Sequence, residues 1–385
     1  IEPVGIPQDV AAGGVAAESS IGTWTELTTI KPYMRGIQAR VFEIKGSEAR
    51  IAYPMELFEA GNMPNILSSV AGNVFGLDAI KHLRLNDIVF PEGLIAGFHG
   101  PKYGIDGVRK LLRVEGRPLV GTIIKPKLGL RTGDHAKVAY NAWEGGCDVV
   151  KDDENLSGQG FNPFEERLGE TLEARDLAEE ETGERKAYMV NVTAETGEML
   201  RRAELVEDQG GRYMMVDILT CGYSALQTLR NSGLDLVIHA HRAGHAAFTR
   251  SQSHGINMRV IAKVARVIGV DQLHVGAVIG KMSETRKEVM ENVEALKEPI
   301  KNIKNVFPVA SGGLHPGLVP RLMKIFGEDS IIQAGGGIHG HPEGTAAGAR
   351  AMRQAVDAVL TGTSLERYAD DYRELAVALE TWSGE

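Results

Sequence analysis

The chain has 385 residues, 43% of them hydrophobic, and is therefore long enough to bury a large core. This length predicts two domains, or one domain plus a large barrel. The formal net charge of -9 gives no basic field for nucleic acid, and no apolar run approaches the ~20 residues that span a bilayer. We therefore expect no nucleic acid and no membrane among its partners. Cys147 and Cys221 are too few for a disulfide framework and favour a reducing cytoplasm.

The first hundred residues, 1–100, predict an α+β domain. Residues 1–7, IEPVGIP, are typical of a strand end entering a turn, so we expect a first strand to be missing upstream. Residues 40–54, RVFEIKGSEARIAYP, alternate as in an antiparallel hairpin, and Met63–Val74 has the periodicity of a helix. The stretch 98–112, rich in Gly before a helical pattern, marks the expected domain boundary.

From Leu119 onward, short apolar runs rich in β-branched residues alternate with segments of helical spacing, which is typical of βα units around a parallel sheet. Helices are expected at Asp134–Trp143, Phe164–Glu181, Met258–Ile268 and Thr345–Leu360. Strands are expected at Leu119–Ile124, Asp148–Val150, Ala187–Val192, Tyr213–Ile218, Asp235–Ala240, Gln272–Val275, Val306–Ala310 and Ile331–Ala334. This pattern predicts a (β/α)8 TIM barrel over residues 101–385, preceded by the α+β amino-terminal domain.

Polar residues follow most of the predicted barrel strands. In such a barrel the carboxyl ends of the strands meet at one mouth, where the chemistry takes place. Six of the eight predicted strands end in titratable groups, hydroxyls or glycine clusters, which random surface polarity would seldom produce. We therefore expect one shared active site at this rim. The residues concerned are Lys125, Lys127, Lys151, Asp152, Asp153, Glu154, Asn155, His239, His241, Arg242, His274, Ser311, Gly312, Gly313, Gly335, Gly336 and Gly337.

The segment KDDEN, residues 151–155, directly follows the second predicted strand and is the main candidate for a metal site. Asp153 and Glu154 offer hard oxygen ligands, which Mg²⁺ prefers. The cationic Lys151 would be repelled by the metal, but CO₂ would convert its neutral amine into an anionic carbamate ligand. For this, desolvation or nearby positive charge must lower the pKa of the amine. The alternative is a solvated charge run after a strand.

Two kinds of residue at the rim are candidates for binding phosphate groups. The glycines after the seventh and eighth strands lack Cβ atoms, so their N–H groups can approach a phosphate, and the usual phosphate site of such barrels lies there. Arg242, with its forked donors, and His274 are candidates for a second phosphate. The alternatives are ordinary turn glycines and structural histidines.

Lys281 lies in the Gly-containing segment AVIGKMSE after the sixth strand, which is a candidate lid over the mouth. A lid lysine would place its charge against a developing carboxylate. The alternative is an exposed loop lysine.

These residues lie in motifs that resemble those of the large subunit of rubisco, ribulose-1,5-bisphosphate carboxylase/oxygenase, and most closely its archaeal form III branch. The resemblance covers nearly the whole chain, and the motifs follow one another in the family's order. They are AAESSIGTWTE and AGNVFG before the barrel, and GTIIKPKLGL, GGCDVVKDDEN, HAHRAGHA, DQLHVGAVIGK, SGGLHP and QAGGGIHGHPEG within it.

The resemblance implies a role for each matching residue at the metal. Lys151 would be the lysine that carries CO₂ as a carbamate, and Asp153 and Glu154 would complete the protein's Mg²⁺ ligands. Lys125 would be the acid/base lysine near the reacting carbons, and Lys127 its electrostatic partner.

Other matching residues are implied to handle the substrate. Lys281 would orient CO₂ from the lid, and His241 would assist proton transfer and bind substrate hydroxyls. One end of the bisphosphate and a hydroxyl would be held by Arg242, His274 and Ser311. The other phosphate would be cradled by Thr23, Trp24, Gly312, Gly313, Gly335 and Gly336. Glu18 and Asn73 would come from the partner subunit, which implies a homodimer with shared sites, or an assembly of such dimers.

The implied reaction begins when the carbamate on Lys151 takes the C3 proton of ribulose 1,5-bisphosphate, which gives an enediolate that Mg²⁺ stabilises. CO₂ then adds at C2, and hydration and cleavage release two 3-phosphoglycerates. O₂ competes for the same enediolate. In the archaeal branch the substrate is expected to arise from nucleotide salvage.

One departure from the family pattern leaves alternatives open. The segment Ser283–Val306 is shorter than the family's, and Ser283 stands where an acidic residue is expected. Either the printed chain omits residues, or this variant has a trimmed excursion after Lys281. A rubisco-like sugar-phosphate enolase or isomerase would keep the metal site without handling CO₂. A binding or assembly paralogue would keep the fold alone. Retention of the whole reactive set favours the carboxylase.

Overall fold

The computed structural model describes residues 1–23, 25–280 and 284–383. Among these residues, no helix is both long and apolar enough to cross a membrane. The chain divides into two compact units, one of residues 1–99 with 244–268 and the other of residues 100–243 with 269–385. The expected division into domains 1–100 and 101–385 stays a prediction.

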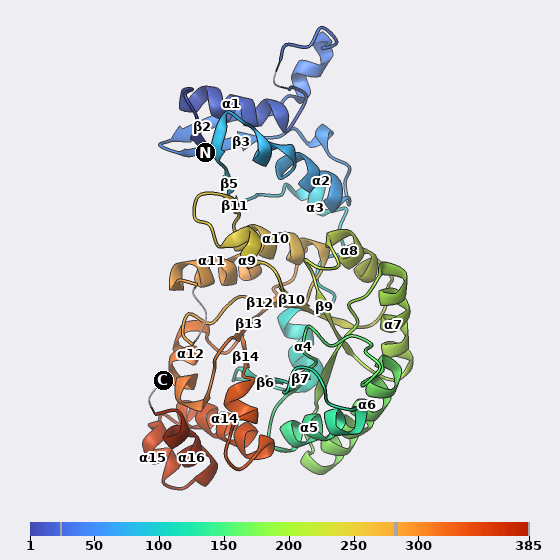
Figure 1. Cartoon of the computed structure of the whole chain (residues 1–385), viewed down its shortest axis with the longest axis vertical. Coiled ribbons are helices and arrows are strands. Elements are labelled where there is room, and N and C mark those ends of the chain that lie inside the picture. The colour runs from blue at the N-terminus through green and yellow to red at the C-terminus, as the bar shows by residue number, and fades with distance from the viewer. Residues whose placement is uncertain (24, 281–283, 384–385) are drawn as a thin grey trace. The chain divides into compact units, whose positions relative to one another are not determined.

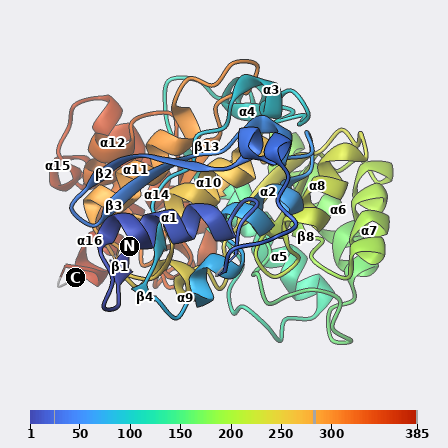
Figure 2. The ribbon, with the colours of Figure 1, turned by 90° about the horizontal axis from the view of Figure 1, so that it is seen from above.

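The first unit combines short strands and helices. Its elements are β1 (Glu2–Pro3), α1 (Gln8–Glu18), β2 (Arg40–Lys45), β3 (Glu48–Ala52), α2 (Met63–Val70), β4 (Ile80–His82), β5 (Arg84–Leu85), α3 (Glu92–Ile95), α9 (Ala246–Thr249), β11 (Gly255–Ile256) and α10 (Met258–Ile268), with 3₁₀ turns at Pro32–Ile37, Met55–Leu57 and Asn73–Gly76 (Figure 1). The β2–β3 pair is the expected antiparallel hairpin, and α1 packs against β2 (Figure 2). A small core forms around Val15, Val74 and Leu83. The predicted α+β character is confirmed.

The helix predicted over Met63–Val74 is shorter in the structure. It ends at Val70, and Asn73–Gly76 forms a separate 3₁₀ turn. The chain turns sharply at Gly72, where an added Cβ atom would lie 2.0 Å from the Ser68 carbonyl oxygen. The close approach that ends the helix therefore depends on a glycine.

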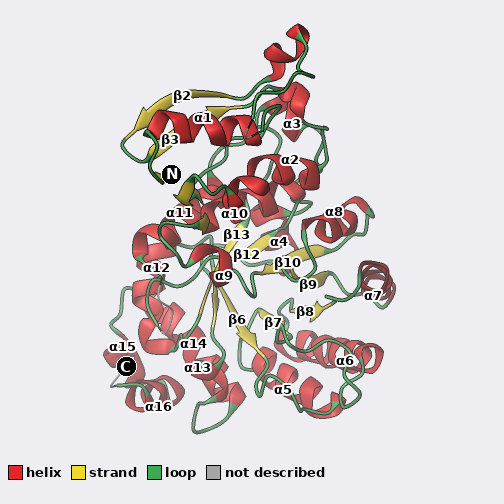
Figure 3. Ribbon diagram, turned by 45° about the horizontal axis from the view of Figure 1, so that its top comes forward, coloured by secondary structure: helices red, strands yellow, loops and turns green. Residues whose placement is uncertain are grey.

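The second unit is built on a parallel barrel. Its elements are α4 (Gly104–Leu112), β6 (Leu119–Ile123), α5 (Thr132–Glu144), β7 (Val149–Lys151), α6 (Phe164–Thr182), β8 (Ala187–Asn191), α7 (Thr196–Asp208), β9 (Tyr213–Asp217), α8 (Tyr223–Asn231), β10 (Val237–His241), β12 (Gln272–His274), α11 (Arg286–Lys297), β13 (Phe307–Ser311), a 3₁₀ turn (Pro316–Leu318), α12 (Val319–Phe326), β14 (Ile331–Gln333), α13 (Gly336–His339), α14 (Thr345–Leu360), α15 (Leu365–Ala369) and α16 (Arg373–Thr381). Within the described residues, eight strands close the barrel in chain order, with β14 pairing back to β6. Figure 3 shows these strands inside a ring that includes α5, α6, α7, α12 and α14. The predicted TIM barrel is confirmed.

An apolar layer fills the amino-terminal end of the barrel. The first residues of seven strands, together with residues two positions further along three of them, belong to one buried cluster. Side chains at positions i and i+2 face the same side of a strand, so the cluster occupies the barrel interior. Helix α4 adds Ile105, Val108 and Leu112 to the same cluster. The strand members are Leu119, Val149, Ala187, Met189, Tyr213, Met215, Val237, Phe307, Val309 and Ile331.

We expect this layer to contribute strongly to stability. Leu112→Ala would remove a side chain that is 2% exposed and should lower the free energy of unfolding by about 2–5 kcal/mol, because it leaves a cavity. Leu177→Ala is the matched control, since that leucine is 47% exposed and its loss should change stability by less than about 0.5 kcal/mol. Urea unfolding followed by circular dichroism measures both variants. Equal effects would contradict the packing of α4 into the barrel.

Candidate active site

The barrel strands change from apolar to polar toward their carboxyl ends. Lys151 follows the core residue Val149 by two positions, and Asp217 follows Met215 in the same way. Since such residues share a face of the strand, the polar side chains lie above the apolar layer in the barrel interior. The same step along other strands leads to Asn191, His239, Ser311 and Gln333. This polar layer is the candidate site.

Asp152 is buried and supports the turn that follows β7. Its carboxylate accepts hydrogen bonds from the Tyr188 hydroxyl at 2.7 Å, the Asn191 N–H at 3.0 Å and Arg167 Nε at 3.1 Å, and it contacts His135 Nε2 at 3.0 Å. Burial opposes ionisation of this carboxyl, but the charge of Arg167 and the contact with His135 outweigh it and hold its pKa below the usual range. Asp152 therefore supports the turn after β7. The next two carboxylates, those of Asp153 and Glu154, remain available at the barrel mouth.

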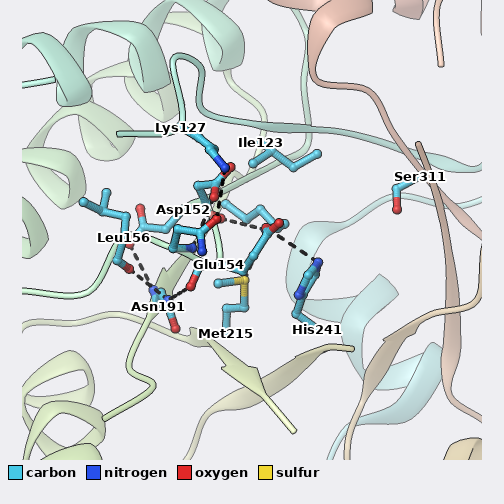
Figure 4. Close-up of polar contacts among 12 residues, drawn as sticks. Ile123, Lys127, Asp152, Glu154, Leu156, Asn191, Met215, His241 and Ser311 are labelled. Atoms are coloured by element: carbon cyan, nitrogen blue, oxygen red, sulfur yellow. Dashed lines mark hydrogen bonds and ion pairs between the residues drawn. The ribbon is translucent and has the colours of Figure 1, made fainter. Parts of the chain in front are cut away.

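The Lys151 side chain is 1% exposed and lies between several acceptors. Its Nζ donates to the Asp152 carbonyl oxygen at 2.7 Å, and it lies 3.3 Å from Met215 Sδ and 3.4 Å from Glu154 Oε2 (Figure 4). Burial lowers the pKa of this amine, while the charges of Glu154 and Asp153 partly offset the effect. The environment thus favours a neutral, nucleophilic amine more than bulk water does.

The two lysines after β6 reach the acidic segment after β7. Lys125 Nζ donates to Asp153 Oδ2 at 2.6 Å, and this carboxylate is almost fully buried. Lys127 Nζ donates to Asn155 Oδ1 at 3.4 Å. The structure therefore brings Lys125 to a candidate metal ligand and Lys127 to the same segment after β7, since β6 and β7 are adjacent.

His241 faces Glu154 from the other side of the mouth. Its Nδ1 lies 2.7 Å from Asp217 Oδ1. Its Nε2 lies 3.6 Å from Glu154 Oε2 (Figure 4). A carboxylate only accepts, so Nδ1 carries a proton and the ring is held with Nε2 toward the mouth. Burial opposes ionisation of Glu154, but the charges of Lys151 and His241 outweigh it and bring the pKa of Glu154 to about 2.

A buried chain of hydrogen bonds crosses three strands beside His241. Gln272 Oε1 lies 2.8 Å from His239 Nδ1, His239 Nε2 lies 2.9 Å from His274 Nε2, and His274 Nδ1 lies 2.8 Å from Ser311 Oγ. The His274 ring also packs edge-on against the His241 ring at 4.8 Å. Burial lowers the pKa of His239 to about 3 and that of His274 well below its ordinary value, so both rings are neutral near pH 7.

Arg242, a predicted phosphate ligand, is paired with Glu284. Its Nη1 lies 2.6 Å from Glu284 Oε1, and its Nη2 donates to Oε2 at 3.0 Å. The Arg242 side chain is 7% exposed and the Glu284 side chain 15%. A carboxylate therefore already lies against the guanidinium that the sequence assigns to phosphate.

The glycine cluster after β13 adopts backbone angles at which residues with side chains would be strained. Gly312 and Gly313 have φ angles of 114° and 73°, which L side chains rarely adopt. An added Cβ atom on Gly335 would lie 3.3 Å from Lys125 Cε, so this backbone lies directly beside the β6 lysine. Gly336 begins the short helix α13. The clusters thus place bare backbone at the rim, as a phosphate site requires.

Lys151, Asp153 and Glu154 fit Mg²⁺ only if Lys151 supplies an oxygen ligand. Among the described residues, no group of three or more His, Cys, Asp or Glu side chains is placed to hold a metal ion. Asp153 and Glu154 supply oxygen, whereas Lys151 lies beside Glu154 as an amine. Because Mg²⁺ prefers oxygen ligands, Lys151 would join them as a carbamate and not as a free amine.

Three predicted site residues belong to the first unit, and two more lie outside the described residues. Glu18 ends α1, Thr23 follows it, and Asn73 begins a 3₁₀ turn, all in the first unit. Trp24 and Lys281 lie outside the described residues. The roles expected for these residues stay predictions.

Sequence reasoning missed Asn191 and Asp217. Asn191 Nδ2 donates to the carbonyl oxygens of Glu154 at 3.2 Å and Leu156 at 2.9 Å (Figure 4). Asp217 orients His241. Each is the last residue of an otherwise apolar strand, AYMVN or YMMVD. A polar residue that ends such a run was the available signal.

Two family models match the chain. The "Ribulose bisphosphate carboxylase large chain, N-terminal domain" model matches residues 1–94, and the "catalytic domain" model of the same large chain matches residues 104–382. The chain belongs to this family. Among curated rubisco sequences, it is 52% identical to the ribulose bisphosphate carboxylase of Methanocaldococcus jannaschii over 96% of this chain and 93% of that protein. It is 49% identical to that of Pyrococcus furiosus over 99% and 92%.

Solved rubisco structures are similar as well. The octameric enzyme of Pyrococcus horikoshii, in complex with sulfate ion, has a TM-score of 0.95 at 47% identity and covers 99% of this chain and 91% of that one. The dimeric rubisco of Hyperthermus butylicus has a TM-score of 0.93 at 47% identity, with 99% and 94% covered. These rubiscos assemble as an octamer and a dimer.

We expect Asp152→Asn to destabilise the protein. The change leaves the buried Arg167 with a neutral partner, which should cost about 3–5 kcal/mol of unfolding free energy at pH 7. The native pKa of Asp152 is depressed, so its stabilisation is fully present above the unfolded pKa of about 4 and is lost as the pH falls below it. The difference between the two proteins should therefore shrink from about pH 5 downward, as urea unfolding would measure.

Asp176→Asn is the control for this change, because the Asp176 side chain is 65% exposed and pairs with Arg175 at the surface. A stability loss for Asp152→Asn that is small, or that does not depend on pH in this range, would contradict the supporting role.

Proposed function

We propose that this chain catalyses the Mg²⁺-dependent carboxylation of ribulose 1,5-bisphosphate to two molecules of 3-phosphoglycerate, with O₂ as a competing substrate. The observation that carries the proposal is the convergence of a buried Lys151 with Asp153 and Glu154 in one barrel mouth. The identity to the Methanocaldococcus jannaschii carboxylase supports it. Supply of the substrate by nucleotide salvage stays a prediction of the resemblance.

Lys151 has the environment that carbamylation needs. CO₂ adds to a neutral amine, whose nitrogen forms the new N–C bond and releases one proton. Burial of Lys151 lowers its pKa and so favours the neutral amine. The modified side chain, Asp153 and Glu154 would then hold Mg²⁺ through oxygen. The bound metal would act as a Lewis acid on the oxygens of the substrate.

The chain's own groups surround the reacting carbons. Lys125 is held by Asp153 beside the metal ligands, where it can deliver or accept a proton. His241, oriented by Asp217, presents Nε2 to the same space. Lys127 adds positive charge at this edge, which stabilises negative charge that develops on the substrate.

The two phosphates would bind at different parts of the mouth. Arg242 follows β10, and His274 and Ser311 end β12 and β13, whereas Gly335 and Gly336 follow β14 next to Lys125. Glu18 and Asn73 would complete each site from a partner subunit, which fits the dimeric and octameric assemblies of the similar rubiscos.

The direct test incubates the purified protein with Mg²⁺, labelled bicarbonate and ribulose bisphosphate and measures labelled 3-phosphoglycerate. We expect Lys151→Ala to reduce this product by more than about 100-fold, because even the loss of a partner of a metal ligand costs about 10–100-fold. Lys186→Ala is the control. Lys186 is equally a buried lysine, but it lies before β8 at the other end of the barrel, bonded to the Cys147 carbonyl oxygen.

Exchange of the C3 proton without any labelled product would replace the proposal with a sugar-phosphate enolase or isomerase. A protein that binds the bisphosphate without either reaction would favour a binding paralogue. Full activity of Lys151→Ala would contradict the metal site.

A further inference from the structure

Gln272 and His239 form the inner half of the hydrogen-bond chain that ends at Ser311. They are directly opposed on neighbouring strands, and both are 0% exposed. His274, the next member, is 3% exposed, whereas Ser311 at the end of β13 is only half-buried. The hydrogen-bond chain thus runs from the barrel core to the mouth. Its first two residues, Gln272 and His239, are too deep to touch a substrate.

The direction of each hydrogen bond follows from Gln272, which lies at the buried end of the series. Gln272 Oε1 can only accept, so His239 Nδ1 carries a proton. A neutral imidazole has one N–H, so His239 Nε2 accepts and His274 Nε2 donates to it. His274 Nδ1 is then an acceptor, and the Ser311 hydroxyl donates to it. Each link fixes the next, because neither ring can donate from both nitrogens while it is neutral.

We propose that Gln272 and His239 are positioning residues that act through His274 to turn the Ser311 proton away from the mouth. Ser311 Oγ then presents lone pairs to the ligand and accepts a hydrogen bond from a substrate hydroxyl, while it disfavours an oxyanion or carbonyl oxygen. The identity of the ligand as a sugar bisphosphate rests on the proposed function. The direction of the hydrogen bonds from Gln272 to Ser311 does not depend on that function.

The orientation of the Gln272 amide determines the direction of every hydrogen bond between Gln272 and Ser311. If the amide were turned by 180°, its NH₂ group would donate to His239 Nδ1, and every later link would reverse. Ser311 would then donate to the ligand. The two orientations therefore predict opposite tautomers for both histidines, and this difference can be observed without any substrate.

The first test is a double-mutant cycle with Gln272→Met and Ser311→Ala. With Ser311 present, Gln272→Met should raise KM for ribulose bisphosphate by about fivefold, with a smaller change in kcat. The reason is that the Ser311 hydroxyl is then no longer held in one orientation. With Ser311→Ala, the same change should have less than about a twofold effect. Thr171→Val is the control, because Thr171 is also 0% exposed but lies on helix α6 and not on the strands that carry this hydrogen-bond chain. It should affect both backgrounds equally.

The second test records ¹⁵N spectra of the ligand-free wild-type protein labelled at histidine. We expect His239 to be protonated at Nδ1 and His274 at Nε2. The opposite tautomers, or an equal effect of Gln272→Met in both backgrounds, would overturn the proposal. A wild-type protein that makes no 3-phosphoglycerate would instead refute the proposed function, and the spectra would still decide the direction of the chain.

Discussion

The buried carboxylate of Asp152 holds the active-site segment in place. It ties the end of β7 to helix α5 through His135, to helix α6 through Arg167, and to β8 through Tyr188 and Asn191. Because these partners come from both sides of the strand, the backbone after β7 has little freedom to turn. The following two carboxylates are thereby directed to the mouth, where flexible side chains alone would not keep them together.

The site has two halves with different physical character. Around β6 and β7 the groups are charged, since Lys125 pairs with Asp153, and the charges of Lys151, His241 and Lys125 lower the pKa of the Glu154 carboxyl. Inside the barrel at β10 and β12, the His239 and His274 rings are neutral, because burial disfavours their charged forms. The first half suits metal binding and proton transfer, and the second suits the recognition of hydroxyl groups by oriented dipoles.

Much of this arrangement could be predicted from the sequence. The barrel strands are short apolar runs, and their polar ends identify the mouth, so the amino-acid order alone places Lys151 and His241 there. The supporting role of Asp152 was not predicted, because its partners His135 and Arg167 lie far along the chain and reach it only through the packing of α5 and α6. Gln272 was missed as well, since it begins a strand and its partner is defined by the register with the neighbouring strand.

The contact between Arg242 and Glu284 has a consequence for ligand choice. A guanidinium covered by a carboxylate exerts little attraction on the small monovalent anions of the surrounding solution, because its field is already neutralised at close range. A phosphate ester carries more charge and more acceptor oxygens than the carboxylate that it would replace. If Arg242 binds a phosphate as proposed, that phosphate would have to displace the Glu284 carboxylate, so a divalent anion would be favoured over a monovalent one.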